Sequence, residues 1–294
     1  MTERAEFRRI AIVGTGLIGG SFGLAAERAC PSASFVAYDR PEVLRHLGRV
    51  NFKWELAEDL AEAVQEADLV FVALPVGAII EQLPEIARKC RTGALVVDAG
   101  STKVKICNAA RKCFVEESCG SRKFLGGHPL AGRELDGIVN ADPELFRGSK
   151  YVLIGNATEE GKDYRIERFA NLLRRLGAEP VWSDAETHDW AMAVVSHMPQ
   201  LVAIALARVI SGETDETGLP VALAGSGLRD MLRIAGSRYE TWRDICMTNA
   251  DNIVRSLDRI AQVIEFIRTH IASRELETEF HSANELYRSL REVH

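Results

Sequence analysis

The sequence predicts an α/β domain with a doubly wound, mostly parallel sheet, followed by an all-helical domain. Up to about Trp182, short β-branched runs alternate with longer amphipathic stretches. This alternation is typical of a parallel sheet covered by helices on both faces. A glycine-rich turn joins the first strand to the first helix. After Asp184 strand patterns disappear, and apolar residues recur at helical spacing.

Chain length and composition favour two globular domains. The chain has 294 residues, of which 47% are hydrophobic and 27% charged, and no segment is dominated by one residue type. A single core rarely grows beyond roughly 250 residues, so a second domain is expected. We place the boundary near Thr187, which gives domains at residues 1–187 and 188–294.

Charge and hydropathy narrow the function classes. The net charge is −6 and Lys/Arg-rich blocks are absent, which argues against nucleic acid or anionic lipid as a partner. The charged start lacks the pattern of a secretion signal, so we expect a cytoplasmic protein. The apolar run from Ala191 to Ile210 is interrupted by His197, Pro199, Gln200 and Arg208. We interpret this run as a buried helix rather than a membrane span.

The six cysteines do not suggest a metal site. They show no CxxC pair and no zinc-like Cys/His spacing, and they are Cys30, Cys90, Cys107, Cys113, Cys119 and Cys246. Reduced, scattered thiols are therefore expected, with no bound metal.

The expected strands are short and β-branched. They are IAIV, residues 35–38, LVFVAL, ALVVD and YVLIG, with FLGGH and EPVW as further candidates. Helical patterns cover residues 60–66, 78–89 and 164–176, and the last ends at Gly177, as helices often do. In the second half, helices are expected up to Ile210, over 226–234 and over 242–271.

The glycine-rich turn has the features of a dinucleotide-binding site. Gly14, Gly16 and Gly19 follow the strand IAIV and open a helix. The first permits a tight turn, the second lets backbone approach a pyrophosphate, and the third lets helix and strand pack closely. The pyrophosphate would lie at the helix N-terminus, where free N–H groups favour an anion. Strand, turn and helix together predict a Rossmann-type nucleotide site.

An acidic residue after the second strand selects the nucleotide. Asp39 lies 20 residues beyond Gly19, where a carboxylate can bind the adenosine ribose and repel a 2′-phosphate. This favours NAD, although the adjacent Arg40 leaves NADP open as the less favoured cofactor. The predicted cofactor contacts also include Leu17, Ile18, Leu74 and Pro75.

Three segments follow expected strands, at the edge of the sheet where ligands of α/β proteins bind: ALPVG, DAGSTK and GGHPLAG. His128, within the third, is expected on a turn at a strand end. A histidine on a turn is often only a hydrogen-bonding surface residue. Its neighbours favour a catalytic role instead.

Several motifs together resemble the prephenate and arogenate dehydrogenase family of tyrosine biosynthesis. They are GLIGGS, DAGSTK, HPLAG with Glu134, Gly137 and the pair Leu145 and Phe146, the pair His188 and Asp189, SHMP, and GLRDMLRIA followed by Trp242. The matching motifs run in order from about Arg9 to Ile245, which is most of the chain.

The resemblance implies oxidative decarboxylation of a cyclohexadienol, with hydride transferred to the nicotinamide and a ring carboxylate lost as carbon dioxide. A neutral base must then lie near the substrate hydroxyl, and an imidazole suits neutral pH. His128 is the candidate base. By analogy with the family, Ser101 binds the same hydroxyl and aligns it.

The resemblance also places the substrate's carboxylate on a guanidinium, which can make two parallel hydrogen bonds. Arg233 matches the family motif, while Arg229 lies one helical turn earlier and could also point inward. Asp230 could orient Arg233. Trp242 either lines the substrate pocket or belongs to the core.

The SHMPQ segment bears on the choice of substrate. Pro199 should kink its helix, while Ser196 and Gln200 share a face and His197 is turned away from it. All three are candidate substrate contacts. Many family members carry histidine in place of Gln200, and there the residue recognises the substrate's side chain. A neutral amide weakens the case for prephenate and makes arogenate more acceptable. Both substrates stay open.

The sequence leaves two alternative functions open. Another dehydrogenase of the same architecture, acting on a β-hydroxy acid or on aminodeoxyprephenate, shares the cofactor motif but lacks this ordered set of motifs. A non-catalytic NAD-binding sensor would need neither Ser101 nor His128. The family resemblance further implies a homodimer formed through the helical domains.

Overall fold

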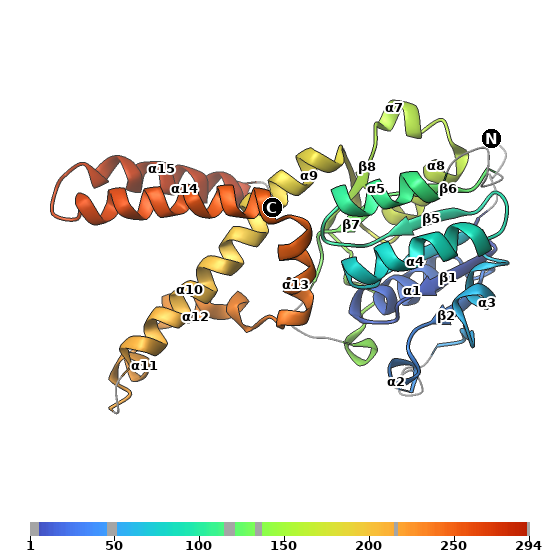
Figure 1. The fold of residues 1–294 in the computed structure, drawn as a ribbon, viewed down its shortest axis with the longest axis horizontal. Helices are drawn as coiled ribbons and strands as arrows, with labels where there is room; N and C mark the ends of the chain where they lie inside the picture. Colours follow the sequence, from blue (N-terminus) through green and yellow to red (C-terminus); the bar gives the residue numbers. More distant parts are fainter. Residues whose placement is uncertain (1–5, 46–51, 115–120, 133–136, 215–216, 293–294) are drawn as a thin grey trace.

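The computed structural model describes residues 6–45, 52–114, 121–132, 137–214 and 217–292. A sheet-containing part and a helical part lie side by side (Figure 1). Six parallel strands form the main sheet in the order β3-β2-β1-β4-β5-β6. They are β1 (Arg9–Val13), β2 (Ser34–Tyr38), β3 (Glu55–Leu56), β4 (Leu69–Val72), β5 (Leu95–Asp98) and β6 (Lys123–Leu125). This order confirms the Rossmann-type, doubly wound fold.

Helices cover both faces of this sheet, as a parallel sheet requires. The elements of this part are α1 (Leu17–Ala29), α2 (Pro41–Leu44), α3 (Leu60–Val64), α4 (Val76–Lys89), α5 (Val104–Cys113), η2 (Ile138–Asn140), α7 (Ala157–Glu160) and α8 (Tyr164–Arg175). One core joins α1 and α8 to the sheet through Phe22, Phe71 and Phe169. The other joins α3, α4 and α5 to it through residues such as Val70 and Ile79.

A second, smaller sheet corrects one expectation. The segments YVLIG and EPVW do not extend the main sheet. They form β8 (Lys150–Ile154) and β9 (Glu179–Ser183), which lie with β7 (Gly127–Pro129) in a three-stranded sheet. The chain changes sheets at Gly126, where a side chain would lie 3.0 Å from Cys107 and Ile154 atoms. His128 is therefore within β7, antiparallel to Val152 of β8, and the expectation of a turn there is wrong.

The end of α8 follows the sequence pattern. Gly177 has a φ of 80°, the left-handed conformation that favours glycine. Its N–H donates to the carbonyl of Arg174 at 3.0 Å, and the N–H of Ala178 donates to that of Leu173 at 3.0 Å. This paired arrangement satisfies carbonyls that the helix end would leave unbonded.

The regular elements of the second part are all helices in its described residues. Its elements are α9 (Ala185–Met192), η3 (Ala193–His197), α10 (Met198–Glu213), α11 (Leu219–Ala222), α12 (Ser226–Leu232), η4 (Arg233–Gly236), α13 (Tyr239–Thr248), α14 (Ala250–Thr269) and α15 (Leu276–Glu292). The single helix expected over 242–271 is divided at Asn249. The side-chain amide of Asn249 bonds the carbonyl of Asp189 at 2.7 Å, which fixes a local conformation outside the helix.

At the place where a kink is expected near Pro199, the helical run contains a π-helical turn, η3, which ends two residues before the proline. Proline lacks an N–H, and a wider turn accommodates the missing bond. The whole helical run Ala185–Glu213 is long and apolar enough to cross a membrane by composition, but only 22% of its apolar window is buried within the chain. The expectation of a buried helix is thus wrong for the single chain, because apolar side chains of α10 such as Ile204 and Val209 stay exposed.

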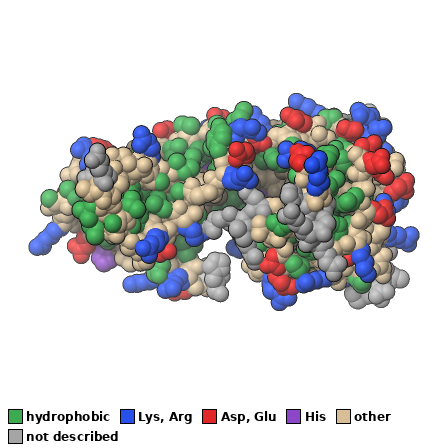
Figure 2. All heavy atoms as spheres, turned by 90° about the horizontal axis from the view of Figure 1, so that it is seen from below, with side chains coloured by type: hydrophobic (Ala, Val, Ile, Leu, Met, Phe, Trp, Pro, Cys, Tyr) green, Lys and Arg blue, Asp and Glu red, His purple; other side chains and the backbone are tan. Residues whose placement is uncertain are grey.

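Hydrophobic side chains remain exposed over the helical part, as Figure 2 shows on one face. On α14 they include Val254, Val263 and Ile264, and on α15 Phe280 and Leu286, each at least 40% exposed. Scattered apolar side chains are normal on a surface, but extended apolar helix faces mark a contact region.

Candidate active site

The glycine-rich turn has the geometry that the sequence predicts for a nucleotide site. Gly14 has a φ of 94°, and a side chain there would lie 2.5 Å from the Ala73 carbonyl oxygen. A side chain at Gly19 would lie 1.8 Å from the Gly14 carbonyl oxygen. A side chain at Gly16, the N-cap of α1, would meet no atom within 4 Å. Two glycines thus close the turn, and the third leaves space in front of the helix N-terminus.

Asp39 is fixed at the end of β2 beside this turn. Its Oδ2 accepts hydrogen bonds from the Thr15 N–H at 2.6 Å and hydroxyl at 3.1 Å. Arg40 is exposed, and its guanidinium lies 3.5 Å from Glu42. A carboxylate oxygen held at the carboxyl edge, together with the open N-terminus of α1, fits the ribose and pyrophosphate of a dinucleotide.

The remaining predicted cofactor residues lie at the same edge. Leu17 and Ile18 open α1, and Pro75 is the N-cap of α4. A Leu74 methyl carbon lies 2.9 Å from where a Gly14 side chain would begin. The structure therefore brings the sequence-predicted cofactor residues together around the ends of β1, β2 and β4.

A buried ion pair occupies the end of β5. Asp98 and Lys103 are fully buried, and the ammonium binds Asp98 Oδ2 and donates to the Gly127 carbonyl at 2.6 Å. Asp98 also accepts from the N–H groups of Gly100 at 2.9 Å and Gly127 at 3.1 Å. A buried charge requires such partners. The pair fixes β7 against β5, and with it the loop that carries Ser101. Sequence reasoning quoted both residues within DAGSTK but assigned them no role.

His128 faces a second histidine. His128 Nδ1 lies 2.9 Å from His188 Nε2, and His188 Nδ1 lies 2.8 Å from Asp189 Oδ1. Burial, with the nearby charges of His188, Lys103 and His197, lowers the pKa of His128 well below its ordinary value. His128 is therefore a neutral imidazole at neutral pH. Sequence reasoning recognised the pair at 188 and 189 only as part of the family resemblance.

Asp189 also connects the two parts of the chain. Its carboxylate accepts hydrogen bonds from the N–H groups of Lys103 at 2.7 Å and Val104 at 2.9 Å, at the N-terminus of α5. Carboxylates are favourable at this end of a helix because they bond its free N–H groups and oppose its dipole. The helical part thereby holds the loop that precedes α5.

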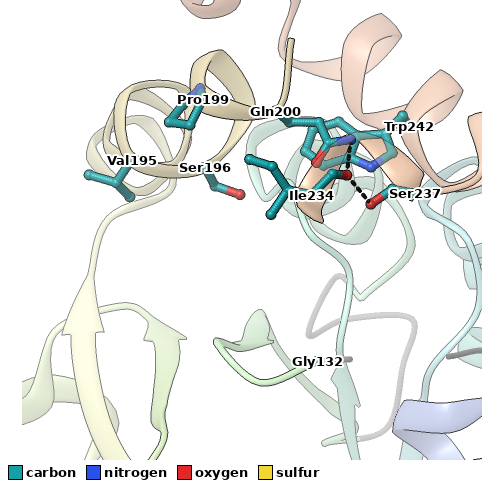
Figure 3. A pocket seen from close by; sticks show the side chains of 8 residues that line it. All are labelled: Gly132, Val195, Ser196, Pro199, Gln200, Ile234, Ser237 and Trp242. Atoms are coloured by element: carbon teal, nitrogen blue, oxygen red, sulfur yellow. Dashed lines mark hydrogen bonds between the residues drawn. The ribbon is translucent and has the colours of Figure 1, made fainter. Parts of the chain in front are cut away.

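A cavity of about 340 Å³ lies mainly among helices of the helical part. Its lining residues are Gly132, Val195, Ser196, Pro199, Gln200, Ile234, Ser237 and Trp242. In Figure 3, Ser196, Gln200 and Trp242 surround the same space, and the amide of Gln200 points toward Ile234. The Gln200 amide N–H donates to the Ile234 carbonyl at 2.8 Å, and the Ser237 hydroxyl donates to the same oxygen at 3.0 Å.

The other predicted substrate residues lie around this cavity but do not line it. His197 is 1% exposed, and its Nδ1 lies 3.2 Å from the Asn249 amide nitrogen. Its ring meets the Trp242 ring edge-on at 5.9 Å. Arg233 begins η4 directly before Ile234, and Arg229 is exposed on α12. Asp230 is likewise exposed on α12. Glu134, part of the family resemblance, lies outside the described residues.

Potential metal ligands are not grouped in the described part of the chain: it contains no cluster of three His, Cys, Asp or Glu side chains that could hold an ion. The chemistry available there consists of a neutral imidazole, a hydroxyl and a dinucleotide cradle. A Rossmann-type sheet carrying these groups at its carboxyl edge defines a dinucleotide-dependent dehydrogenase.

Comparison with known proteins identifies the family. The model described as "Prephenate dehydrogenase, nucleotide-binding domain" matches residues 22–181, and "Prephenate dehydrogenase, dimerization domain" matches residues 184–291. The chain therefore belongs to the prephenate dehydrogenase family, as its motifs predicted.

Individual relatives agree with this assignment. A prephenate dehydrogenase of Lactococcus lactis is 32% identical over 98% of this chain and 78% of its own length. The crystal structure of prephenate dehydrogenase from A. aeolicus, in complex with hydroxyphenyl propionate and NAD+, superposes with a TM-score of 0.84 at 25% identity, covering 99% of this chain and 100% of that one. Arogenate dehydrogenase of Synechocystis gives a TM-score of 0.74 at 27% identity, with 97% and 99% covered.

Proposed function

We propose that this protein oxidatively decarboxylates prephenate, arogenate or both, with NAD as the hydride acceptor, in tyrosine biosynthesis. The products are 4-hydroxyphenylpyruvate from prephenate and tyrosine from arogenate. The observation that carries the proposal is a neutral, partly buried His128 imidazole in β7, the strand that follows the carboxyl end of β6 in the dinucleotide-binding sheet. Family membership supports the same reaction.

NAD supplies the hydride acceptor when it is bound. Gly14, Gly16 and Gly19 would hold its pyrophosphate, and Asp39 would accept a hydrogen bond from its adenosine ribose. The Asp39 carboxylate would repel a 2′-phosphate, and the neighbouring Arg40 is paired with Glu42. NADP is accordingly the weaker cofactor.

His128 removes the proton of the substrate's ring hydroxyl as hydride leaves the same carbon. Ser101, half-buried after β5, binds that hydroxyl and aligns it. Arg233 binds a substrate carboxylate, with Ser196 and Trp242 lining the pocket. His197 supports Trp242 from behind, through the edge-on ring contact. The ring carboxylate leaves as carbon dioxide, and aromatisation drives the step.

Gln200 sets the ratio of the two substrates. One of its two amide N–H groups is donated to the Ile234 carbonyl, which fixes the amide and leaves its carbonyl oxygen as an acceptor for a ligand. An acceptor suits the ammonium group of arogenate better than the keto group of prephenate, which is itself an acceptor. Replacing Gln200 with histidine should therefore shift the ratio of specificity constants toward prephenate.

The deciding experiment measures NADH formation with prephenate and arogenate, each with NAD and NADP. We expect activity with NAD and at least one of the two substrates. The His128→Asn variant should lose turnover by about 100-fold or more, because a general base contributes 10²–10⁴-fold. Silence with both substrates would refute the function, and a ratio unchanged in Gln200→His would remove that residue as the selector.

The assembly is a homodimer formed by the helical domain. The exposed apolar faces of α14 and α15, the poorly buried α10 and the match to a dimerization-domain model support this arrangement. Dimerisation would cover the apolar surface of α10, so the helix need not enter a membrane. Further parts of the proposal are a cytoplasmic location, no nucleic-acid partner and a division into residues 1–187 and 188–294.

A further inference from the structure

We propose that His188, held by Asp189, is a positioning residue that fixes His128 in the tautomer whose Nε2 is the base. The inference rests on the proposed function, because it concerns how the same imidazole is prepared for proton removal. His188 itself acts only through His128.

The geometry consists of two consecutive short contacts. His128 Nδ1 and His188 Nε2 are 2.9 Å apart, and His188 Nδ1 and Asp189 Oδ1 are 2.8 Å apart. The side chains of His188 and Asp189 are each 1% exposed, so water does not compete with these bonds. The rings of His128 and His188 meet edge-on, with their centroids 5.1 Å apart and their planes at 73°.

The Asp189 carboxylate decides which nitrogen carries the proton in the His188 ring and, through it, in the His128 ring. An ionised Asp189 only accepts, so a neutral His188 carries its proton on Nδ1 and a lone pair on Nε2. That lone pair requires a donor, so His128 carries its proton on Nδ1. The Nε2 of His128 is then left without a proton and free to accept one from the substrate. The opposite tautomer would place a proton on Nε2 and block the base.

The position of Asp189 is independently fixed. Its two oxygens accept from the Lys103 and Val104 N–H groups at the start of α5, at 2.7 and 2.9 Å. Its own carbonyl accepts from the Asn249 amide at 2.7 Å. Three N–H donors, the His188 ring included, hold this carboxylate, so it cannot rotate away. It therefore serves as a rigid reference for both imidazoles.

The charges around His128 come from several elements. Lys103, on the loop before α5, donates to the carbonyl of Gly127, the residue before His128, and is paired with Asp98 of β5. His188 contacts it from α9, and the charge of His197 on η3 also acts on it. The phenol of Tyr151, from β8, is buried beside Gly127. The Lys103 ammonium disfavours protonation of His128 to an imidazolium. The hydrogen bonds through His188 and Asp189 therefore select between the two tautomers of a His128 ring that is already neutral.

The test uses two replacements of His188 in the full-length protein. The amide oxygen of His188→Gln can occupy the place of Nε2 and accept from His128, whereas His188→Met has no such acceptor. We expect His188→Met to lower kcat by about 100-fold with little change in KM or in NAD affinity, because only the base is affected. His188→Gln should recover most of that loss. His270→Gln, at the far end of α14, serves as the matched control.

A direct measurement of the tautomer separates positioning from general structural support. With ¹⁵N-labelled histidine, long-range proton–nitrogen NMR reports which ring nitrogen carries the proton, and His128→Asn assigns the signals. We expect Nδ1–H for His128 in the wild type and in His188→Gln, and a mixture of tautomers in His188→Met.

Two results overturn the inference: a wild-type His128 protonated on Nε2, or a His188→Met variant with wild-type kcat and tautomer. Failure of the proposed function is a different outcome, because the wild type would then oxidise neither prephenate nor arogenate. The NMR result does not depend on activity, so it decides the tautomer in either case.

Discussion

His197 gives a stability prediction whose size follows from its surroundings. The ring is 1% exposed, and burial lowers its pKa to about 4 from an ordinary value of 6.5. The charge of Asp189 opposes this shift, and that of His188 adds to it. The Asn249 amide is a donor 3.2 Å from His197 Nδ1, which requires the neutral ring. Folding therefore excludes a proton that the unfolded chain would bind.

The sign and magnitude follow from proton linkage. Because the folded-state pKa lies below the unfolded one, the unfolded chain binds more protons between the two values, and stability falls as pH drops through 6.5 toward 4. One tenfold change in proton affinity is worth about 1.4 kcal/mol, so this histidine should remove about 2 kcal/mol at about pH 5. At about pH 7.5 its effect should be close to zero.

The assay is urea unfolding, followed by circular dichroism at fixed protein concentration, for the wild type and His197→Gln at both pH values. The wild type should lose about 2 kcal/mol more than the variant on acidification. His281→Gln, whose side chain is 74% exposed on α15, should lose as much as the wild type. Equal losses in the wild type and His197→Gln would show that the ring is not held neutral, and would refute the reasoning.

Three further outcomes concern the active site. Gly19→Ala should abolish NAD binding, because its new carbon would lie 1.8 Å from the Gly14 carbonyl oxygen; Gly16→Ala, with no atom within 4 Å, should fold normally and weaken only cofactor affinity in a fluorescence titration. Asp39→Asn should raise the NADP-to-NAD ratio of specificity constants, and an unchanged ratio would contradict its assigned role. Because the pKa of His128 is lowered, kcat/KM should lose activity on acidification only well below pH 6.5; a midpoint at or above 6.5 would contradict the lowered pKa.

Local patterns explain why the fold was predictable. Strand and helix periodicity, together with the glycine turn, depend on residues close in sequence, and these patterns located β1, β2, β4 and β5 correctly. The second sheet was missed because a strand's hydrophobic pattern does not specify its partner. Gly126 redirects the chain only through its close contacts with Cys107 and Ile154, which are distant in sequence.

The candidate site was predictable only in part, for the same reason. His128 and Ser101 could be proposed from motifs at strand ends, but the partner of His128 lies 60 residues away at His188. The fully buried Lys103 contradicts the usual expectation for a lysine and is stabilised by Asp98, at the end of β5, and by the Gly127 carbonyl. The exposed apolar face of α10 was not predicted from the sequence. An apolar helix has the same sequence pattern whether residues of its own chain or of another chain cover it.

The contacts between the two parts explain why catalytic geometry should depend on their relative position. Two helices of the Rossmann-type part receive carboxylates from the helical part: Asp189 at the start of α5, and Asp244, whose Oδ2 accepts from the Gly77 N–H of α4 at 2.8 Å. Both helices begin at the carboxyl edge of the sheet, where the cofactor and His128 are placed. A displacement of the helical part would thus break the bonds of Asp189 at the start of α5 and move His188 away from His128. In the proposed mechanism, the orientation of the base therefore depends on the relative position of the two parts through Asp189, a side chain that contacts no substrate.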